Sequence, residues 1–187
     1  CSYNWGYPIT IGQRGIIDSG ETDEAFAISL LNECYETEGI KTKTQELARF
    51  VEITGIGYTY VDINTEYENG DSYFTVDVLD PRNTFVVRST HYVDKRIVLA
   101  VTFTDDLNGN RHYTCFTKDT RFEIYCNGSA YAFGERNAER NPLGIIPIVE
   151  WIRSYDRMGC FERQLPEMDN LNILASDFTN DVDQNCQ

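Results

Sequence analysis

The stretch that decides the fold is YTYVDINTEYENGDSYFTVDVL, residues 58–79. Aromatic and β-branched residues alternate with polar ones on both sides of Asn69-Gly70. Alternation of this kind is typical of strands with one buried face, and Asn-Gly between two such runs is a strong signal for a hairpin. The stretch therefore predicts two antiparallel strands, over residues 58–63 and 73–79, joined by a turn at Asn69-Gly70.

Two further Asn-Gly pairs, at 108–109 and 127–128, repeat this pattern. Each pair is flanked by runs of β-forming residues, which cover 96–104, 111–117, 122–126 and 130–133. Three such turns predict an antiparallel meander rather than a parallel sheet with crossover helices.

A first helix is predicted before the sheet, from Thr22 to about Tyr35. Thr22 is a candidate N-cap, and Asp23 and Glu24 suit the positive end of a helix dipole. Apolar residues recur every three or four positions and give the helix one apolar face: Phe26, Ala27, Leu30, Leu31 and Cys34.

A second helix is predicted from about Lys43 to Thr54. Thr42 followed by Gln45 fits a capping box at its start. Gly55 is well placed to end the helix in a left-handed turn.

The region after the meander is predicted to hold an edge strand, a polar loop and a long helix. Residues 145–151 are apolar apart from Glu150, and Pro147 within them favours an edge or irregular position. Residues 153–160 are polar and loop-like. From about Pro166, which suits a first helical turn, apolar residues follow at three- and four-residue steps: Met168, Leu171, Leu174, Phe178 and Val182.

The same terminal helix is acidic on the rest of its surface, through Asp169, Asp177, Asp181 and Asp183. The predicted order is thus two helices, an antiparallel sheet and an acidic amphipathic helix, which is an α+β fold.

The charge balance argues against a general nucleic-acid-binding face. The chain of 187 residues has a net charge of −14, and its Lys and Arg residues are scattered, whereas such a face needs them clustered. Two interpretations of the acidity stay open: solubility, or a surface that repels a polyanion.

The cysteines indicate free thiols rather than a disulfide framework or a metal site. The six of them form no CxxC pair, and only two His residues accompany them. We therefore expect reduced, mostly buried cysteines and neither a metal nor a cofactor. No apolar run reaches the length of a membrane span.

Templates for catalysis fit poorly. The chain has no Gly-rich phosphate loop, no GxSxG elbow and no HExxH motif. Residues 105–110 resemble the start of a calcium-binding loop, but the twelfth position counted from Asp105 is Phe116 instead of an acidic residue. His112 and Cys115 are the residue types that a nucleophilic pair would need. A packed cysteine and an exposed histidine on one strand are the better interpretation of them. The residues thus predict a structural or binding role.

Several segments, taken in order, resemble the SPP1-type portal family of tailed bacteriophages. Residues 143–151, LGIIPIVEW, are similar to the family's L-G-x-[IV]-P-[IV]-[IV]-x-[aromatic] stretch. GCFE at 159–162 and the helix over 165–181 follow in register, although Cys160 replaces the usual Asp and Arg153-Ser154 replaces an Asn pair. Upstream, residues 57–61 and 78–87 resemble two of the family's strands.

This resemblance implies a non-enzymatic subunit of a ring, typically a dodecamer, at one vertex of the capsid. Residues 1–150 would form the outer wing, and 151–187 a linker and the start of a stem helix. The clip, the second stem helix and the crown would lie outside this chain, which would then be a fragment. Expected partners are further copies of the subunit, terminase, head-completion, capsid and scaffolding proteins, and double-stranded DNA passing through without sequence recognition. The expected location is the virion, after assembly in the cytoplasm of the bacterial host.

The resemblance gives the terminal helix two expected surfaces. The apolar stripe named above would contact other helices. The four aspartates would face the channel and repel DNA phosphates, with an ordinary solvated face as the alternative.

Two rival functions remain at this point. A phage or host protein-binding module would present the aromatic sheet to a partner without catalysis. A hydrolase would place two close carboxylates with raised pKa values in a deep pocket.

Overall fold

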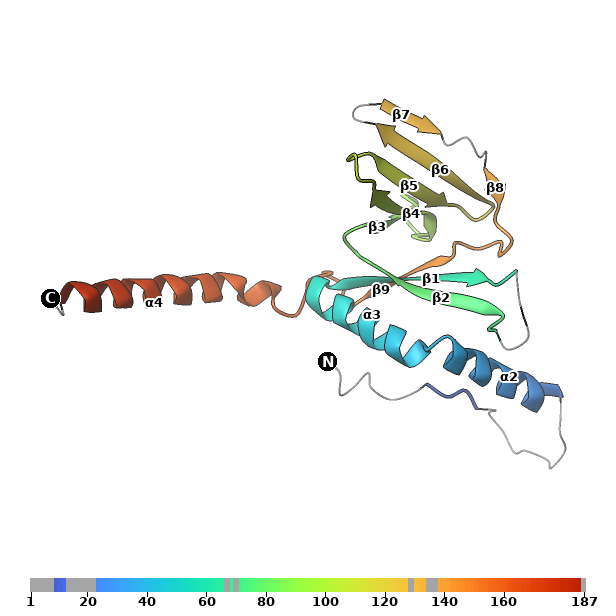
Figure 1. Cartoon of the computed structure of the whole chain (residues 1–187), viewed down its shortest axis with the longest axis horizontal. Coiled ribbons are helices and arrows are strands. Elements are labelled where there is room, and N and C mark those ends of the chain that lie inside the picture. The colour runs from blue at the N-terminus through green and yellow to red at the C-terminus, as the bar shows by residue number, and fades with distance from the viewer. Residues whose placement is uncertain are drawn as a thin grey trace.

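The structure is a computed structural model that describes residues 9–12, 23–65, 68, 71–127, 130–133 and 138–185. It contains helices and antiparallel sheets in the predicted order, so the α+β fold is confirmed. Two sheets lie one above the other, a pair of helices covers the far side of one sheet, and the last helix leaves the body sideways (Figure 1).

The helix pair consists of α2 (Asp23–Thr37) and α3 (Ile40–Thr54). The predicted end of α3 is confirmed, because Gly55 has φ 81° and its N–H donates to the Val51 carbonyl over 3.0 Å. The predicted capping box at Thr42 is wrong, since α3 already begins at Ile40 behind Gly39. Gly39 has φ 61°, which lets the chain turn from α2 directly into α3 without a side-chain cap.

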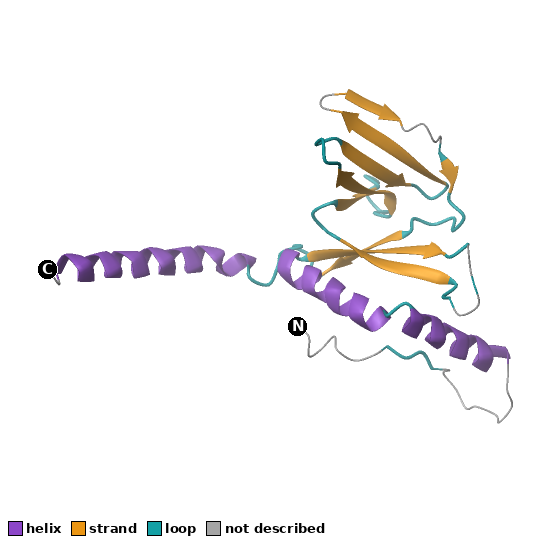
Figure 2. Cartoon of the chain, in the orientation of Figure 1, coloured by secondary structure: helices purple, strands orange, loops and turns teal. Residues whose placement is uncertain are grey.

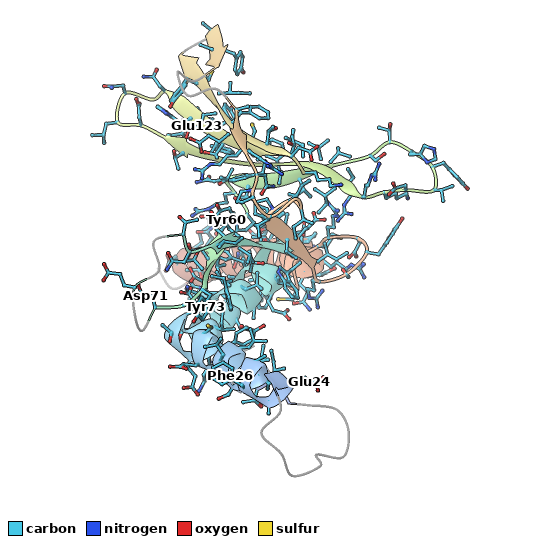
Figure 3. All side chains as sticks on the ribbon, turned by 90° about the vertical axis from the view of Figure 1, so that its right-hand side faces the viewer. Glu24, Phe26, Tyr60, Asp71, Tyr73 and Glu123 are labelled. Atoms are coloured by element: carbon cyan, nitrogen blue, oxygen red, sulfur yellow. The ribbon has the colours of Figure 1, made fainter. Side chains whose placement is uncertain are left out.

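Only part of the predicted apolar face of α2 is buried. Cys34 is 4% exposed, whereas Phe26 is 72% exposed. Phe26 and Glu24 lie on the part of α2 that is far from both sheets (Figure 3). The predicted N-cap, Thr22, lies outside the described residues.

Sheet A, the sheet next to the helices, has strand order β2-β1-β9 and is antiparallel throughout. It is formed by β1 (Ile56–Ile63), β2 (Phe74–Leu79) and β9 (Ile148–Ile152). The predicted pairing of the first two strands is confirmed, while Asn69-Gly70 falls outside the described residues. As predicted, the strand after Pro147 lies at an edge, and the Pro147 carbonyl accepts a hydrogen bond from the Val61 N–H over 2.9 Å.

Sheet B has the order β3-β4-β5-β6-β7, with β8 also pairing with β6. Its strands are β3 (Thr84–Arg88), β4 (Ile97–Asp105), β5 (Arg111–Phe116), β6 (Thr120–Asn127), β7 (Ala130–Phe133) and β8 (Glu139–Arg140). The predicted meander is present from β4 to β7. The sequence pattern did not predict that β1 and β2 belong to a sheet of their own. This separate sheet forms because β9, which lies far along the chain, pairs with β1.

A small apolar core joins the two sheets, whose strands are all drawn in orange in Figure 2. Sheet A supplies Tyr58 and Ile148, and sheet B supplies Ala100 and Phe116, all at most 5% exposed. The Tyr60 ring lies between the sheets (Figure 3), with its centroid 5.5 Å from that of Phe116. Because so few side chains are fully buried here, each contributes a large share of the energy that holds the sheets together.

We expect Phe116→Ala to lower the free energy of unfolding by about 3–5 kcal/mol, because it leaves a cavity between the sheets. Leu107→Ala is the matched control, since Leu107 is fully exposed in the β4–β5 turn and its removal should change little. Chemical denaturation, monitored by circular dichroism, measures the free energy of unfolding of both variants. Equal effects of the two substitutions would contradict the assignment of the core.

Candidate interaction site at the terminal helix

Helix α4 (Leu165–Asn185) projects from the body without packing on either sheet (Figure 1). Every residue of α4 is exposed. Most helical stability in proteins comes from packing of an apolar face rather than from intrinsic propensity. The surface of α4 is therefore the first candidate for a functional site.

The residues of the predicted apolar stripe are all exposed on this helix. Met168, Leu171, Leu174, Phe178 and Val182 are between 42% and 72% exposed. At 3.6 residues per turn these positions share one side of the helix. A continuous apolar stripe left in water is typical of a surface that another helix covers.

The predicted acidic set is only partly separated from the stripe. Helical geometry places Asp169, Asp177 and Asp183 away from it, whereas Asp181 lies two turns from Leu174 on the same line and therefore borders it. The helix sequence contains no Lys or Arg. The side of α4 away from the stripe thus carries acidic and neutral residues, Ile173 among them, but no basic ones.

The base of α4 is held against the C-terminal end of α3 by backbone hydrogen bonds. The Cys160 N–H donates to the Glu52 carbonyl over 2.8 Å, and the Arg153 N–H donates to the Gly55 carbonyl over 2.9 Å. The Arg153 guanidinium also lies 3.2 Å from the Glu52 carboxylate. These contacts fix the loop over residues 153–160, which we call the base loop, on the end of α3.

Two glycines allow the base loop to approach this closely. A Cβ on Gly159 would lie 2.0 Å from the Ile53 carbonyl oxygen, and a Cβ on Gly55 would lie 2.2 Å from the Arg157 carbonyl oxygen. Neither backbone oxygen can move without breaking the contact. Gly159 is thus required for the base loop. The sequence pattern did not reveal this role, because Gly159 was recognised there only as the first residue of the GCFE motif.

The first turns of the helical segment are tied back to the base loop. A short 3-10 helix, η1 (Glu162–Gln164), precedes α4, and the Glu162 carboxylate accepts the Gly159 N–H over 3.0 Å. Asp156 accepts hydrogen bonds from Ser154 and Arg163, which hold the pKa of its carboxyl below the ordinary value. The start of α4 is therefore oriented by side chains as well as by the chain connection.

The other sequence candidates do not assemble into a reaction centre. His112 and Cys115 are three residues apart on β5 and so point to opposite faces of sheet B. Asp106 accepts the N–H groups of Asn108 and Asn110 within a hairpin turn. Within the described ranges, no group of three His, Cys, Asp or Glu side chains is placed to hold a metal.

The remaining titratable groups agree with this picture. The carboxyls whose pKa departs from the ordinary value among the described residues, Asp80, Asp105, Asp106 and Asp156, are all lowered by hydrogen bonds. A hydrolytic carboxylate pair would instead need one pKa raised. Cys34 and Cys115 are buried free thiols, Cys160 is a half-buried free thiol, and Cys126 is half-buried and not in a disulfide. None of the described helices is long and apolar enough to cross a membrane.

Comparison with protein families gives a match that extends over almost the entire chain. The family described as phage portal protein, SPP1 Gp6-like, matches residues 2–185. The chain belongs to this phage portal protein family. No curated protein matches the chain. Family membership confirms the resemblance drawn from residues 57–61, 78–87 and 143–181 and gives the chain a phage portal role.

We expect Gly159→Ala to lower the free energy of unfolding by about 3 kcal/mol, because the added methyl group would collide with the Ile53 carbonyl. Gly12→Ala is the control, since a Cβ there would meet nothing within 4 Å. Thermal and chemical denaturation of both variants measure the difference. A Gly159 variant as stable as the Gly12 variant would contradict the close approach of the base loop.

Proposed function

We propose that this chain forms the wing and the beginning of the stem of a portal ring through which the phage genome is packaged and ejected. Residues 1–150 would be the wing, and residues 151–187 would contain the base loop and the first stem helix. The role is structural rather than enzymatic. The observation that carries the proposal is α4, a helix held firmly at its base with an apolar stripe exposed along its length.

The exposed stripe supports contact with helices of other copies. Members of a ring present the same surfaces in the same orientation, so a stripe on each copy can meet a complementary side of its neighbour. Such head-to-tail contacts close into a ring when the rotation between copies is constant.

The held base of α4 supports the same proposal. A ring closes only if each subunit projects its stem in the same direction. The backbone hydrogen bonds from Cys160 and Arg153 to the end of α3, and the close approach at Gly159, supply that constancy within each copy.

The acidic side of α4 supports a channel that does not bind DNA. A wall with aspartates and no Lys or Arg repels phosphates over a screening length of about 8 Å at physiological salt. DNA can then move past without forming the ion pairs that a basic wall would offer. Asp169, Asp177 and Asp183 suit this role best, because Asp181 borders the stripe.

The wider partners follow from the portal role. The ring would sit at the capsid vertex of the virion after assembly in the host cytoplasm, and would contact capsid, scaffolding, head-completion and terminase proteins. Double-stranded DNA would pass through it without sequence recognition. These partners belong to the proposal and rest on family membership.

Replacement of Leu171 and Phe178 by Asn in the complete phage gene product should abolish or strongly reduce ring formation, because both lie at the centre of the stripe. Ile173→Asn is the matched control: Ile173 is also exposed on α4, at 59%, but points away from the stripe. Native mass spectrometry distinguishes rings from free subunits. Rings formed equally well by both variants would contradict the role of the stripe.

Replacement of Asp169, Asp177, Asp181 and Asp183 by Lys should slow or block DNA packaging, because the channel wall would then attract phosphates. The control carries the same change of charge on the wing, at the exposed residues Glu33, Glu36, Glu46 and Asp119. The DNA content of assembled particles is the measurement. Normal packaging by the α4 variant would refute a channel-facing acidic side.

A further inference from the structure

Glu150 is a half-buried residue whose charged side chain is fully covered by its neighbours. It lies on β9 opposite Tyr58 of β1, and its side chain is 0% exposed. Burial, followed by the nearby charge of Glu150, raises the pKa of Tyr58 above its ordinary value. A carboxylate in such a position needs partners, because transfer of a charge out of water costs several kcal/mol.

Two arginines from different parts of the structure meet this carboxylate at the same oxygen. Arg88 of β3 forms a hydrogen-bonded ion pair with Oε2 of Glu150, and Arg157 of the base loop reaches the same atom over 3.1 Å. The second oxygen, Oε1, is buried without a hydrogen-bond partner among the described residues. Glu150 thus joins sheet A, sheet B and the base of α4 in one cluster.

Stability alone does not account for this cluster. Only the carboxylate is buried, since the Arg88 and Arg157 side chains are 38% and 45% exposed, and ion pairs of a buried charge are often no more stabilising than well-packed apolar residues of the same volume. Polar groups in such a position are better explained by the geometry they impose than by the free energy they contribute.

The backbone around both arginines is unusual and supports a positional role. Arg88 stands where the register between β3 and β4 shifts. Arg157 has φ 55°, the only positive φ at a non-glycine residue among the described positions. A left-handed backbone at a long side chain is uncommon and must be stabilised by its surroundings.

We propose that Glu150 is a positioning residue that couples sheet B to the base of the stem helix and so fixes the angle between them. Through Arg88 and Arg157, a displacement of sheet B changes the direction of α4. This inference rests on the proposed function, because a set angle matters most where many copies must close a ring.

Distances between spin labels at Thr104 of β4 and Asn172 of α4, both exposed, test this coupling. The labels are attached through unnatural amino acids, because the chain contains native cysteines. Labelled molecules are diluted with unlabelled ones, so only distances within one molecule are read. We expect a narrow distance distribution in the natural protein and a broader one in Glu150→Gln.

A triple variant separates positioning from stability. Arg88→Met, Glu150→Met and Arg157→Met together remove all charges and keep the volume apolar, so the fold should persist while the distribution broadens. Asp105→Asn is the control, since it breaks an exposed ion pair with Arg111 in sheet B and should leave the distribution narrow.

Two outcomes would overturn the coupling. One is a narrow, unchanged distribution in a folded triple variant, and the other is loss of the fold in that variant, which would assign the cluster to stability. Either result leaves the proposed function standing if the complete gene product still forms rings. Failure of the natural gene product to form a ring would instead reject the proposed function.

Discussion

The close approach between the base loop and the C-terminal end of α3 is the constraint on which the rest of the structure depends. At Gly159 and Gly55 the two backbones are too near for any side chain to fit between them. This contact holds the start of α4 beside sheet A, although α4 itself touches neither sheet. A long exposed helix is thereby given a direction by a few backbone contacts at one end.

The outer part of the molecule depends on similarly few contacts. The two sheets are joined by a small core around Phe116 and by the buried carboxylate of Glu150. Both features lie close to the strand that leads into the base loop. The contacts that hold the sheets together and those that orient α4 therefore share one region, in which β9 is the common element. This arrangement suits a subunit whose wing must stand in a fixed relation to its stem.

The sequence predicted the features that depend on local pattern. Asn-Gly pairs and the alternation of apolar with polar residues predicted the hairpins, and Gly55 predicted the end of α3. Apolar residues recurring every three or four positions predicted α4. It could not predict the division into two sheets, because the pairing of β9 with β1 joins residues far apart in the chain. The same reason hides Glu150: its partners Arg88 and Arg157 become neighbours only through the tertiary fold. The start of α3 was misplaced because the left-handed Gly39 replaces a side-chain cap, which the pattern at Thr42 concealed.

The central claim is that α4 is a ring-forming stem helix whose apolar stripe is covered by other copies. The most direct measurement is electron cryo-microscopy of the complete phage gene product, combined with native mass spectrometry of the same sample. The account predicts a closed ring with a central channel, the stripe from Met168 to Val182 buried against neighbouring helices, and Asp169, Asp177 and Asp183 facing the channel. A monomer or dimer at all salt concentrations, or a ring in which the stripe stays in contact with water, would contradict it.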